Sequence, residues 1–205
     1  MLKNIILKKT NEYSWQDAFI LLVSQFRLDS EQVRCGSIPE PTLQKLCNYF
    51  VGNGLQIGGF VGLTHAYIAN HLKNNNQGFI CTIDCNVTHR DIKDPIKKLN
   101  FLVRHYGFDE NSMIILDYAE RTMKNYIKLG SKFDFVLLDG NHNYHNVLRE
   151  IKLANNLLKK NGSIILDDID HWTGPKKLFE NFPLQNYKKI EIDSRAGLFK
   201  KVYDA

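Results

Sequence analysis

Five short apolar segments alternate with helix-like segments from residue 55 onward, and this alternation constrains the fold more than any other feature. The strand-like segments are residues 55–57, 78–84, 112–116, 133–138 and 162–168. Between them, apolar residues recur at helical spacing: Ile92, Ile96, Leu99, Val103 and Tyr106, and later Val147, Ile151, Ala154 and Leu158. Apolar strands that alternate with helices predict a parallel sheet covered on both faces.

The end of the chain has a different pattern. Residues 187–193 and 197–203 are both strand-like, and only Ser194 to Ala196 separate them, so we expect an antiparallel hairpin. The predicted fold is therefore α/β: a doubly wound, Rossmann-like, seven-stranded and mostly parallel sheet with a C-terminal antiparallel hairpin.

Accessory helices are predicted before the sheet, over residues 14–26 and 38–50. Ser14 with Asp17, and Ser37 with Glu40, have the spacing of a capping box, and Pro39 is expected in the first turn of the second helix. We predict one domain over residues 1–205, with a helical extension (1–50) and a Rossmann-like core (51–205).

Composition excludes several classes of partner. The chain is 43% apolar and 24% charged, as in ordinary globular proteins, and its net charge of +5 is scattered, so no nucleic-acid partner is expected. No apolar run approaches the ~20 residues of a membrane span, and the N-terminus does not resemble a signal peptide. We expect a cytoplasmic protein without a membrane partner. The four cysteines form no C-x-x-C pair and are expected to be structural thiols.

Glycines separate the first strand of the predicted sheet from the helix that follows it. Gly58, Gly59 and Gly62 lie at this junction, where backbone N–H groups and a helix N-terminus can approach a ligand. The dinucleotide fingerprint needs a further glycine at position 57, where this chain has Ile57. The segment indicates a nucleotide-like ligand.

Carboxylates follow the other strands of the predicted parallel sheet: Asp84, Asp117, Asp139, and the pair Asp167 and Asp168. In open α/β sheets, ligands bind beyond the carboxyl ends of the strands. Asp84 is placed to accept hydrogen bonds from ribose hydroxyls, which fits any adenosine cofactor and does not separate NAD from S-adenosylmethionine. Asp117 alone is equally well explained as a helix cap.

Three of these acids are expected to converge. Asp139, Asp167 and Asp168 end neighbouring strands and would repel one another without a cation, and oxygen ligands suit Mg²⁺. His142 lies three residues after Asp139. A lone loop histidine is usually a surface residue, but one beside a metal site is a candidate general base.

Together these residues resemble class I S-adenosylmethionine-dependent methyltransferases, specifically the metal-dependent catechol-type and antibiotic-sugar O-methyltransferases, over residues 37–203. The family's first motif is an acid-x-Gly-x-aromatic-x-Gly followed by a hydroxyl residue. Here it reads Gln56, Gly58, Phe60, Gly62 and Thr64, with Gln56 in the position of the acid. A glutamine can still hydrogen-bond there but supplies no charge.

The resemblance implies a role for each site residue. S-adenosylmethionine would be bound by Gln56, Gly58, Gly59, Phe60, Gly62, Thr64, Asp84, Asp117, Tyr118 and Asp139. A divalent cation, Mg²⁺ or similar, would be bound by Asp139, Asp167 and Asp168, and His142 would be the base. The catechol branch often has Asn where this chain has Asp168, which favours the sugar and antibiotic branch.

We therefore predict an S-adenosylmethionine-dependent methyltransferase that performs Mg²⁺-dependent O-methylation of a small-molecule hydroxyl on a catechol, sugar or secondary metabolite. The N-terminal segment and residues 170–172, with Trp172, are expected to form the acceptor pocket, and the resemblance implies that Arg34–Ser37 closes over the cofactor. The apolar surface of the N-terminal helices suggests a homodimer or a lid. Two alternatives remain: an NAD-dependent oxidoreductase, which Ile57 and the carboxylates disfavour, and a non-catalytic cofactor-binding member, which Gln56 leaves open.

Overall fold

The computed structural model describes residues 12–202. It contains one seven-stranded sheet in the order β3-β2-β1-β4-β5-β7-β6. The strands are β1 (Gly54–Ile57), β2 (Ile80–Asp84), β3 (Ser112–Leu116), β4 (Phe133–Leu138), β5 (Leu158–Leu166), β6 (Tyr187–Glu191) and β7 (Gly197–Lys201). Neighbours among β1 to β5 are parallel, whereas β7 is antiparallel to both β5 and β6. The predicted mostly parallel sheet with an antiparallel C-terminal hairpin is confirmed.

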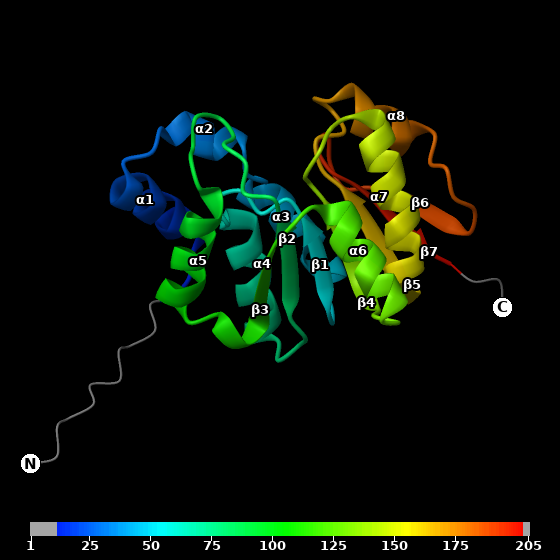
Figure 1. Cartoon of the computed structure of the whole chain (residues 1–205), viewed down its shortest axis with the longest axis horizontal. Helices are drawn as coiled ribbons and strands as arrows, with labels where there is room; N and C mark the ends of the chain where they lie inside the picture. The colour runs from blue at the N-terminus through cyan, green and yellow to red at the C-terminus, as the bar shows by residue number, and fades with distance from the viewer. Residues whose placement is uncertain (1–11, 203–205) are drawn as a thin grey trace, which may run out of the picture.

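Helices cover both faces of the sheet (Figure 1). Those before β4 are α1 (Trp15–Phe26), α2 (Ser30–Cys35), α3 (Glu40–Leu46), α4 (Leu63–Asn74), α5 (Pro95–Tyr106) and α6 (Ala119–Lys128), with short 3₁₀ turns η1 (Cys47–Tyr49) and η2 (Asp109–Asn111). Those after β4 are α7 (Tyr144–Leu157) and α8 (Thr173–Glu180). Helices α1, α4 and α5 lie on one side of the sheet, and α6 and α7 lie on the other (Figure 1). None of the described helices is both long enough and apolar enough to cross a membrane.

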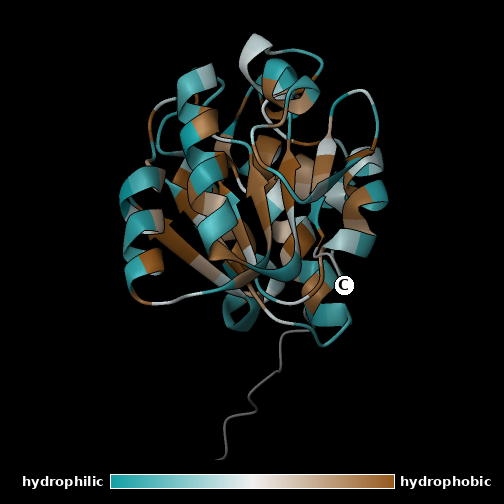
Figure 2. Ribbon diagram, turned by 90° about the vertical axis from the view of Figure 1, so that its right-hand side faces the viewer, coloured by the Kyte–Doolittle hydropathy of each residue, from teal (hydrophilic) through white to brown (hydrophobic). Residues whose placement is uncertain are grey.

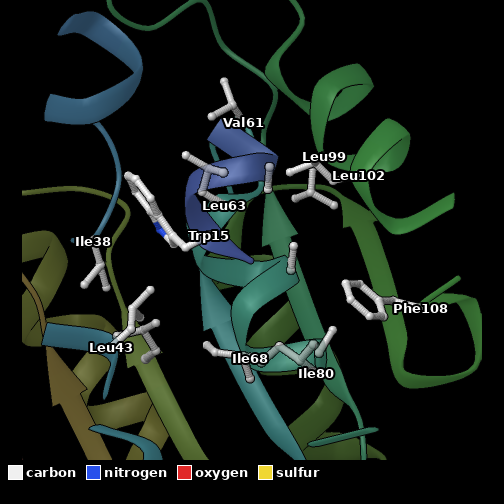
Figure 3. Close-up of a cluster of buried hydrophobic side chains, with 14 of the residues drawn as sticks. Trp15, Ile38, Leu43, Val61, Leu63, Ile68, Ile80, Leu99, Leu102 and Phe108 are labelled. Atoms are coloured by element: carbon white, nitrogen blue, oxygen red, sulfur yellow. The ribbon is translucent and has the colours of Figure 1, made fainter. Parts of the chain in front are cut away.

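Strands β2, β4 and β5 contain apolar runs because each contributes side chains to two cores. On β4, Phe135 and Leu137 pack with α1, α4 and α5, whereas Val136 and Leu138 pack with α6, α7 and α8. The first core also contains Trp15, and its side chains interlock between the helices and the sheet (Figure 3). Apolar residues fill the interior, and the outer helix surfaces are hydrophilic (Figure 2). Each fully buried large apolar side chain contributes about 1.5–3 kcal/mol.

The two predicted helix caps have different outcomes. Ser14 caps α1, where its Oγ accepts the N–H of Asp17 at 3.0 Å, as predicted. The cap predicted at Ser37 is wrong, because its Oγ donates to the carbonyl of Val33, in α2. The extended conformation of Pro39 makes it the N-cap of α3, so this proline does not lie in the first turn.

Several predicted element boundaries also differ from the structure. Helix α3 ends at Leu46 and continues as a 3₁₀ turn, so the helix predicted over 38–50 is shorter. Helix α2 was not predicted; Asp29 caps it by accepting two backbone N–H groups. Strand β5 begins at Leu158, four residues before the predicted start, because Leu158 pairs with Phe133 ahead of a register shift. The last residue of the predicted strand 197–203 lies outside the described residues.

Candidate active site

A cavity of about 630 Å³ lies at the carboxyl ends of β1, β2, β4 and β5 and extends to the residues that follow β3. This volume is within the range of small-molecule sites. Eight predicted site residues line it: Gly58, Phe60, Asp84, Asp117, Tyr118, Asp139, His142 and Asp168. Cys35 and Gly36, from the segment expected to close over the cofactor, and Trp172 line it as well.

The glycine loop joins β1 to α4 at the floor of this cavity. Gly58 has a φ of 86°, and a Cβ atom there would overlap the backbone carbonyl oxygen of Asp139. Gly62, with a φ of 93°, is the N-cap of α4. These conformations favour glycine, and the missing side chain at Gly58 lets the loop pass close to the backbone that follows β4.

Asp84 fixes the conformation of this loop. Its Oδ2 accepts the N–H groups of Gly59 at 2.7 Å and Phe60 at 3.1 Å, and its Oδ1 accepts the N–H of Asn86 at 2.6 Å. The carboxylate therefore ties the loop to the end of β2 while it also lines the cavity. Its binding of ribose remains a prediction.

Gln56 lies beneath the loop and does not line the cavity. Its Nε2 donates to the carbonyl of Gly58 at 2.7 Å, and its Oε1 accepts the hydroxyl of Thr82 at 3.2 Å. Thr82 in turn is 2.7 Å from Nδ1 of His65, whose Nε2 is 2.9 Å from the hydroxyl of Ser112. Because Thr82 donates to Gln56, His65 must donate from Nδ1 and accept at Nε2. Burial lowers the pKa of His65 to about 3, so the ring is neutral.

Other predicted cofactor residues also have structural partners. The Oγ1 of Thr64 accepts the N–H of Ile38 at 3.4 Å and ties the N-terminal segment to α4. Asp117 accepts hydrogen bonds from Arg121, Thr122 and the backbone of Tyr118, and the bond from Arg121 is the main reason that its pKa lies below the usual range. The helix-cap interpretation of Asp117 is wrong, because the N-cap of α6 is Tyr118 and no side chain caps this helix; Asp117 instead holds the side chains of Arg121 and Thr122 in its first turn. Direct contact of Asp117 and Tyr118 with a cofactor remains a prediction.

The acidic cluster differs from the predicted metal set in one residue. Asp167 is buried, and Arg195 donates to both of its oxygens, from Nε at 2.9 and 3.1 Å and from Nη2 at 2.7 Å. The residues that can bring one ligand atom each within 4.8 Å of one another are Asp139, His142 and Asp168. Asp167 is not in this group, and both of its oxygens accept from Arg195, so binding of a cation by Asp139, Asp167 and Asp168 stays a prediction.

The pKa values of these acids reflect their crowding. Burial, followed by the charges of Asp167 and Asp168, raises the pKa of Asp139 well above its ordinary value. Burial also raises the pKa of Asp167, which Arg195 opposes. At Asp168 burial acts in the same direction, but His142 and Arg195 outweigh it and lower the pKa. Three carboxylates share one guanidinium, so the fully ionised cluster has excess negative charge that favours a bound cation.

His142 lies between the acids and an aromatic side chain. Its Nε2 is 3.1 Å from Oδ2 of Asp168, and its ring is stacked on Trp172 with centroids 5.0 Å apart and an interplanar angle of 5°. A Cβ atom at Gly174 would overlap the carbonyl oxygen of His142, so the first turn of α8 packs directly against this loop. Asp168 itself has a φ of 56°, in the left-handed region that aspartate adopts more often than most non-glycine residues.

The cavity residues that were missed from the sequence include Arg195 and Glu150. Arg195 lies in the hairpin connection, where the sequence indicates only a short turn. Glu150 lines the cavity from α7. Its spacing of three from Val147 and four from Ala154 places it on the buried face of that helix, and this spacing is the signal that could have identified it.

A family model described as a methyltransferase domain matches residues 55–169, more than half of the chain. This match spans the glycine loop and all three acids of the cluster. No curated protein sequence matches the chain significantly.

Solved structures share the fold. The O-methyltransferase from Bacillus cereus, in complex with SAH, is 12% identical with a TM-score of 0.71, over 94% of this chain and 92% of that one. The O-methyltransferase TomG from Streptomyces achromogenes, in complex with SAM, is 13% identical with a TM-score of 0.64, over 96% of this chain and 93% of that one. The SAH-bound Podospora anserina methyltransferase PaMTH1 is 16% identical with a TM-score of 0.67, over 95% of this chain and 91% of that one.

Proposed function

This chain belongs to the family of methyltransferase domains, and we propose that it transfers a methyl group from S-adenosylmethionine to a hydroxyl oxygen of a small molecule. The observation that carries the proposal is the convergence of Asp139, His142 and Asp168 at the end of a cavity that also contains the glycine loop and Asp84. The O-methyltransferases from Bacillus cereus and Streptomyces achromogenes, with SAH and SAM bound, support the choice of donor and of acceptor atom.

The cavity fits the proposed methyl donor. Gly58 leaves room for close approach where a side chain would overlap Asp139, and Ile57 and Ile83 add apolar surface below the strand ends. Asp84 adds a carboxylate for vicinal ribose hydroxyls. When bound, S-adenosylmethionine supplies an electrophilic methyl group on its sulfonium.

The acidic cluster fits a divalent cation such as Mg²⁺. Asp139 and Asp168 offer carboxylate oxygens at the cavity, and the charge of the cluster exceeds what Arg195 neutralises. Such a cation would supply a positive charge that orients neighbouring acceptor oxygens and lowers a hydroxyl pKa. Asp167 would contribute through Arg195, as the partner that fixes the position of the guanidinium beside the cluster.

His142 is the proposed proton acceptor. Asp168 lies 3.1 Å from Nε2, and a proton on that nitrogen would leave Nδ1 to accept the proton of the acceptor hydroxyl. Stacking on Trp172 restricts rotation of the imidazole, so the ring is oriented before the acceptor binds.

The acceptor is proposed to be a catechol, a sugar or another secondary metabolite with adjacent oxygens. Two oxygens on neighbouring carbons can both face Asp139 and Asp168, whereas an isolated hydroxyl offers only one. Trp172 is 42% exposed beside the cluster, and its free surface suits a flat or cyclic acceptor.

The test is methyl transfer from S-adenosylmethionine with a deuterated methyl group to catechols and to sugars with vicinal hydroxyls, in the presence of Mg²⁺. We expect the label on an oxygen of the product, detected by mass spectrometry and located by NMR. Asp139→Asn and His142→Ala serve as controls for non-enzymatic methylation. Transfer to nitrogen or carbon would overturn the O-methylation proposal. Tight binding of S-adenosylhomocysteine without any transfer would favour the non-catalytic alternative.

A further inference from the structure

Glu150 is a buried acid that the proposed chemistry does not use. Only 8% of its surface is exposed, and its Oε2 is fully buried without a hydrogen-bond partner among residues 12–202. It lines the main cavity from the sheet-facing side of α7. Buried polar atoms are normally hydrogen-bonded, so an unpaired carboxyl oxygen at a cavity wall indicates a ligand-binding role.

The nearest cation does not neutralise this acid. Arg149 is adjacent in sequence, but its Nη1 pairs with Oε2 of Glu120 on α6 at 2.6 Å, and Lys124 pairs with the other oxygen of Glu120. Arg149 and Glu120 also line the cavity, but they pair with each other, and Glu150 lines it without an ion pair among residues 12–202. Burial raises the pKa of Glu150 to about 7, and both its protonated and its ionised form keep an acceptor oxygen.

The position of Glu150 in the cavity indicates which part of the proposed methyl donor it would contact. The reacting methyl must lie near the cluster of Asp139, His142 and Asp168 beyond β4 and β5, and the ribose is assigned to Asp84 at the end of β2. The adenine is then left with the part of the cavity between α6 and α7, where Ile57 and Ile83 form the apolar floor. Within this part, Glu150 is the buried acid without a partner.

We infer that the Glu150 carboxyl accepts a hydrogen bond from the exocyclic amino group of adenine and makes the site selective for adenosyl over inosyl ligands. The inference rests on the proposed methyl donor. A site that hydrogen-bonds a donor group discriminates strongly against an analogue that lacks it, because its own polar group is left unpaired.

The test compares S-adenosylhomocysteine with S-inosylhomocysteine, in which an oxo group replaces the amino group, by calorimetry on the full chain. We expect the wild-type protein to bind the adenosyl ligand at least about tenfold more tightly. In Glu150→Gln the amide can donate to the oxo group or accept from the amino group, so the preference should fall to about threefold or less. Glu180→Gln, the same change at an exposed position of α8, should keep the wild-type preference.

Thermal melts of both variants establish that they are folded. A wild-type protein that binds both ligands equally overturns the inference regardless of how the variants behave, and so does a folded Glu150→Gln that keeps the full preference. A wild-type protein that binds neither ligand would instead overturn the proposed methyl donor, and this inference with it.

Discussion

Arg195 ties the tip of the C-terminal hairpin to Asp167 at the end of β5. Its Nε and Nη2 donate to both oxygens of a carboxylate that is 1% exposed, and the same guanidinium lies 3.2 Å from Asp168. Through this pair the antiparallel hairpin becomes part of the site, because it brings a permanent positive charge against acids that the parallel strands place together. The pair also leaves Asp139 and Asp168 as the carboxylates that face the cavity.

Replacement of Arg195 by Met should destabilise the protein. It would leave the Asp167 carboxylate buried without a counter-charge, which typically costs about 3–5 kcal/mol of unfolding free energy. Urea unfolding measures this. Arg104→Met, at an exposed position of α5, should change the stability by no more than about 0.5 kcal/mol. Adding Asp167→Asn to the Arg195→Met variant should recover part of the loss, and an undiminished stability in the single variant would contradict the role of the pair.

Removal of divalent cations should abolish turnover and leave cofactor binding intact. Asp139 and Asp168 are proposed to hold the cation near the acceptor, whereas the glycine loop and Asp84 are proposed to hold the methyl donor. Chelation followed by an activity assay and by titration with S-adenosylhomocysteine separates the two. Asp168→Asn should raise the Mg²⁺ concentration needed for half-maximal activity. Turnover that survives chelation would exclude the metal, and loss of S-adenosylhomocysteine binding would show that the two sites are not independent.

Asp84→Ala should weaken the binding of S-adenosylhomocysteine. Two hydrogen bonds to ribose would be lost, at about 1–2 kcal/mol each, and the N–H groups of Gly59 and Phe60 would lose the acceptor that shapes the loop. The expected loss is about 2–4 kcal/mol by calorimetry. Glu110→Ala, an exposed acid near β3, is the control. An affinity that stays at the wild-type value in Asp84→Ala would rule out the ribose role.

His142→Ala should lower kcat by about 10²–10⁴-fold, the usual effect of removing a general base. Affinities for the cation and for S-adenosylhomocysteine should stay nearly the same. His145→Ala tests an exposed histidine three residues further along the chain and should keep wild-type kcat. The decisive measurement is kcat against pH: the acidic limb of the wild-type profile should disappear in His142→Ala. If the limb persists, another group is the base, and if cation affinity falls instead, His142 is a metal ligand.

The parts of this structure that the sequence could reveal are those with local signals. Burial on both faces makes every central strand an apolar run, and the carboxyl end of a parallel strand is a fixed place for an acid, so Asp84, Asp139 and Asp168 could be assigned to one rim. The link between Asp167 and Arg195 joins residues 28 positions apart through the register of β5 and β7, and no local pattern encodes it.

Helix starts and buried polar groups were harder to predict for similar reasons. The cap predicted at Ser37 was wrong, because α3 begins after Pro39 and the Ser37 hydroxyl donates to the carbonyl of Val33. In the sequence, nothing distinguishes His65 from the other residues of an amphipathic helix, so its burial could not be predicted. Its contacts with Thr82 and Ser112 exist only because α4 packs across β2 and β3.

His65 should make the stability of the protein depend on pH. Its pKa is about 3 in the folded protein and near 6.5 in an unfolded chain. Between these values the unfolded chain binds a proton that the folded protein does not. Stability is therefore complete above about pH 6.5 and falls as the pH is lowered toward 3, by about 1.4 kcal/mol per pH unit from this group.

Urea unfolding of the wild type and of His65→Gln, between about pH 7 and about pH 4, isolates this contribution because all other titrating groups are common to both. The variant should be less stable at neutral pH, since Thr82 and Ser112 lose a well-placed partner, and its stability should fall less steeply as the pH is lowered. His145→Gln, a change at an exposed histidine, should keep the wild-type slope.

Since the chain of hydrogen bonds from His65 ends at Gln56 and the carbonyl of Gly58, protonation of the ring would also loosen the glycine loop. Equal slopes in the wild type and His65→Gln would mean that His65 is protonated as easily in the folded protein as in the unfolded chain, and the neutral network would be excluded.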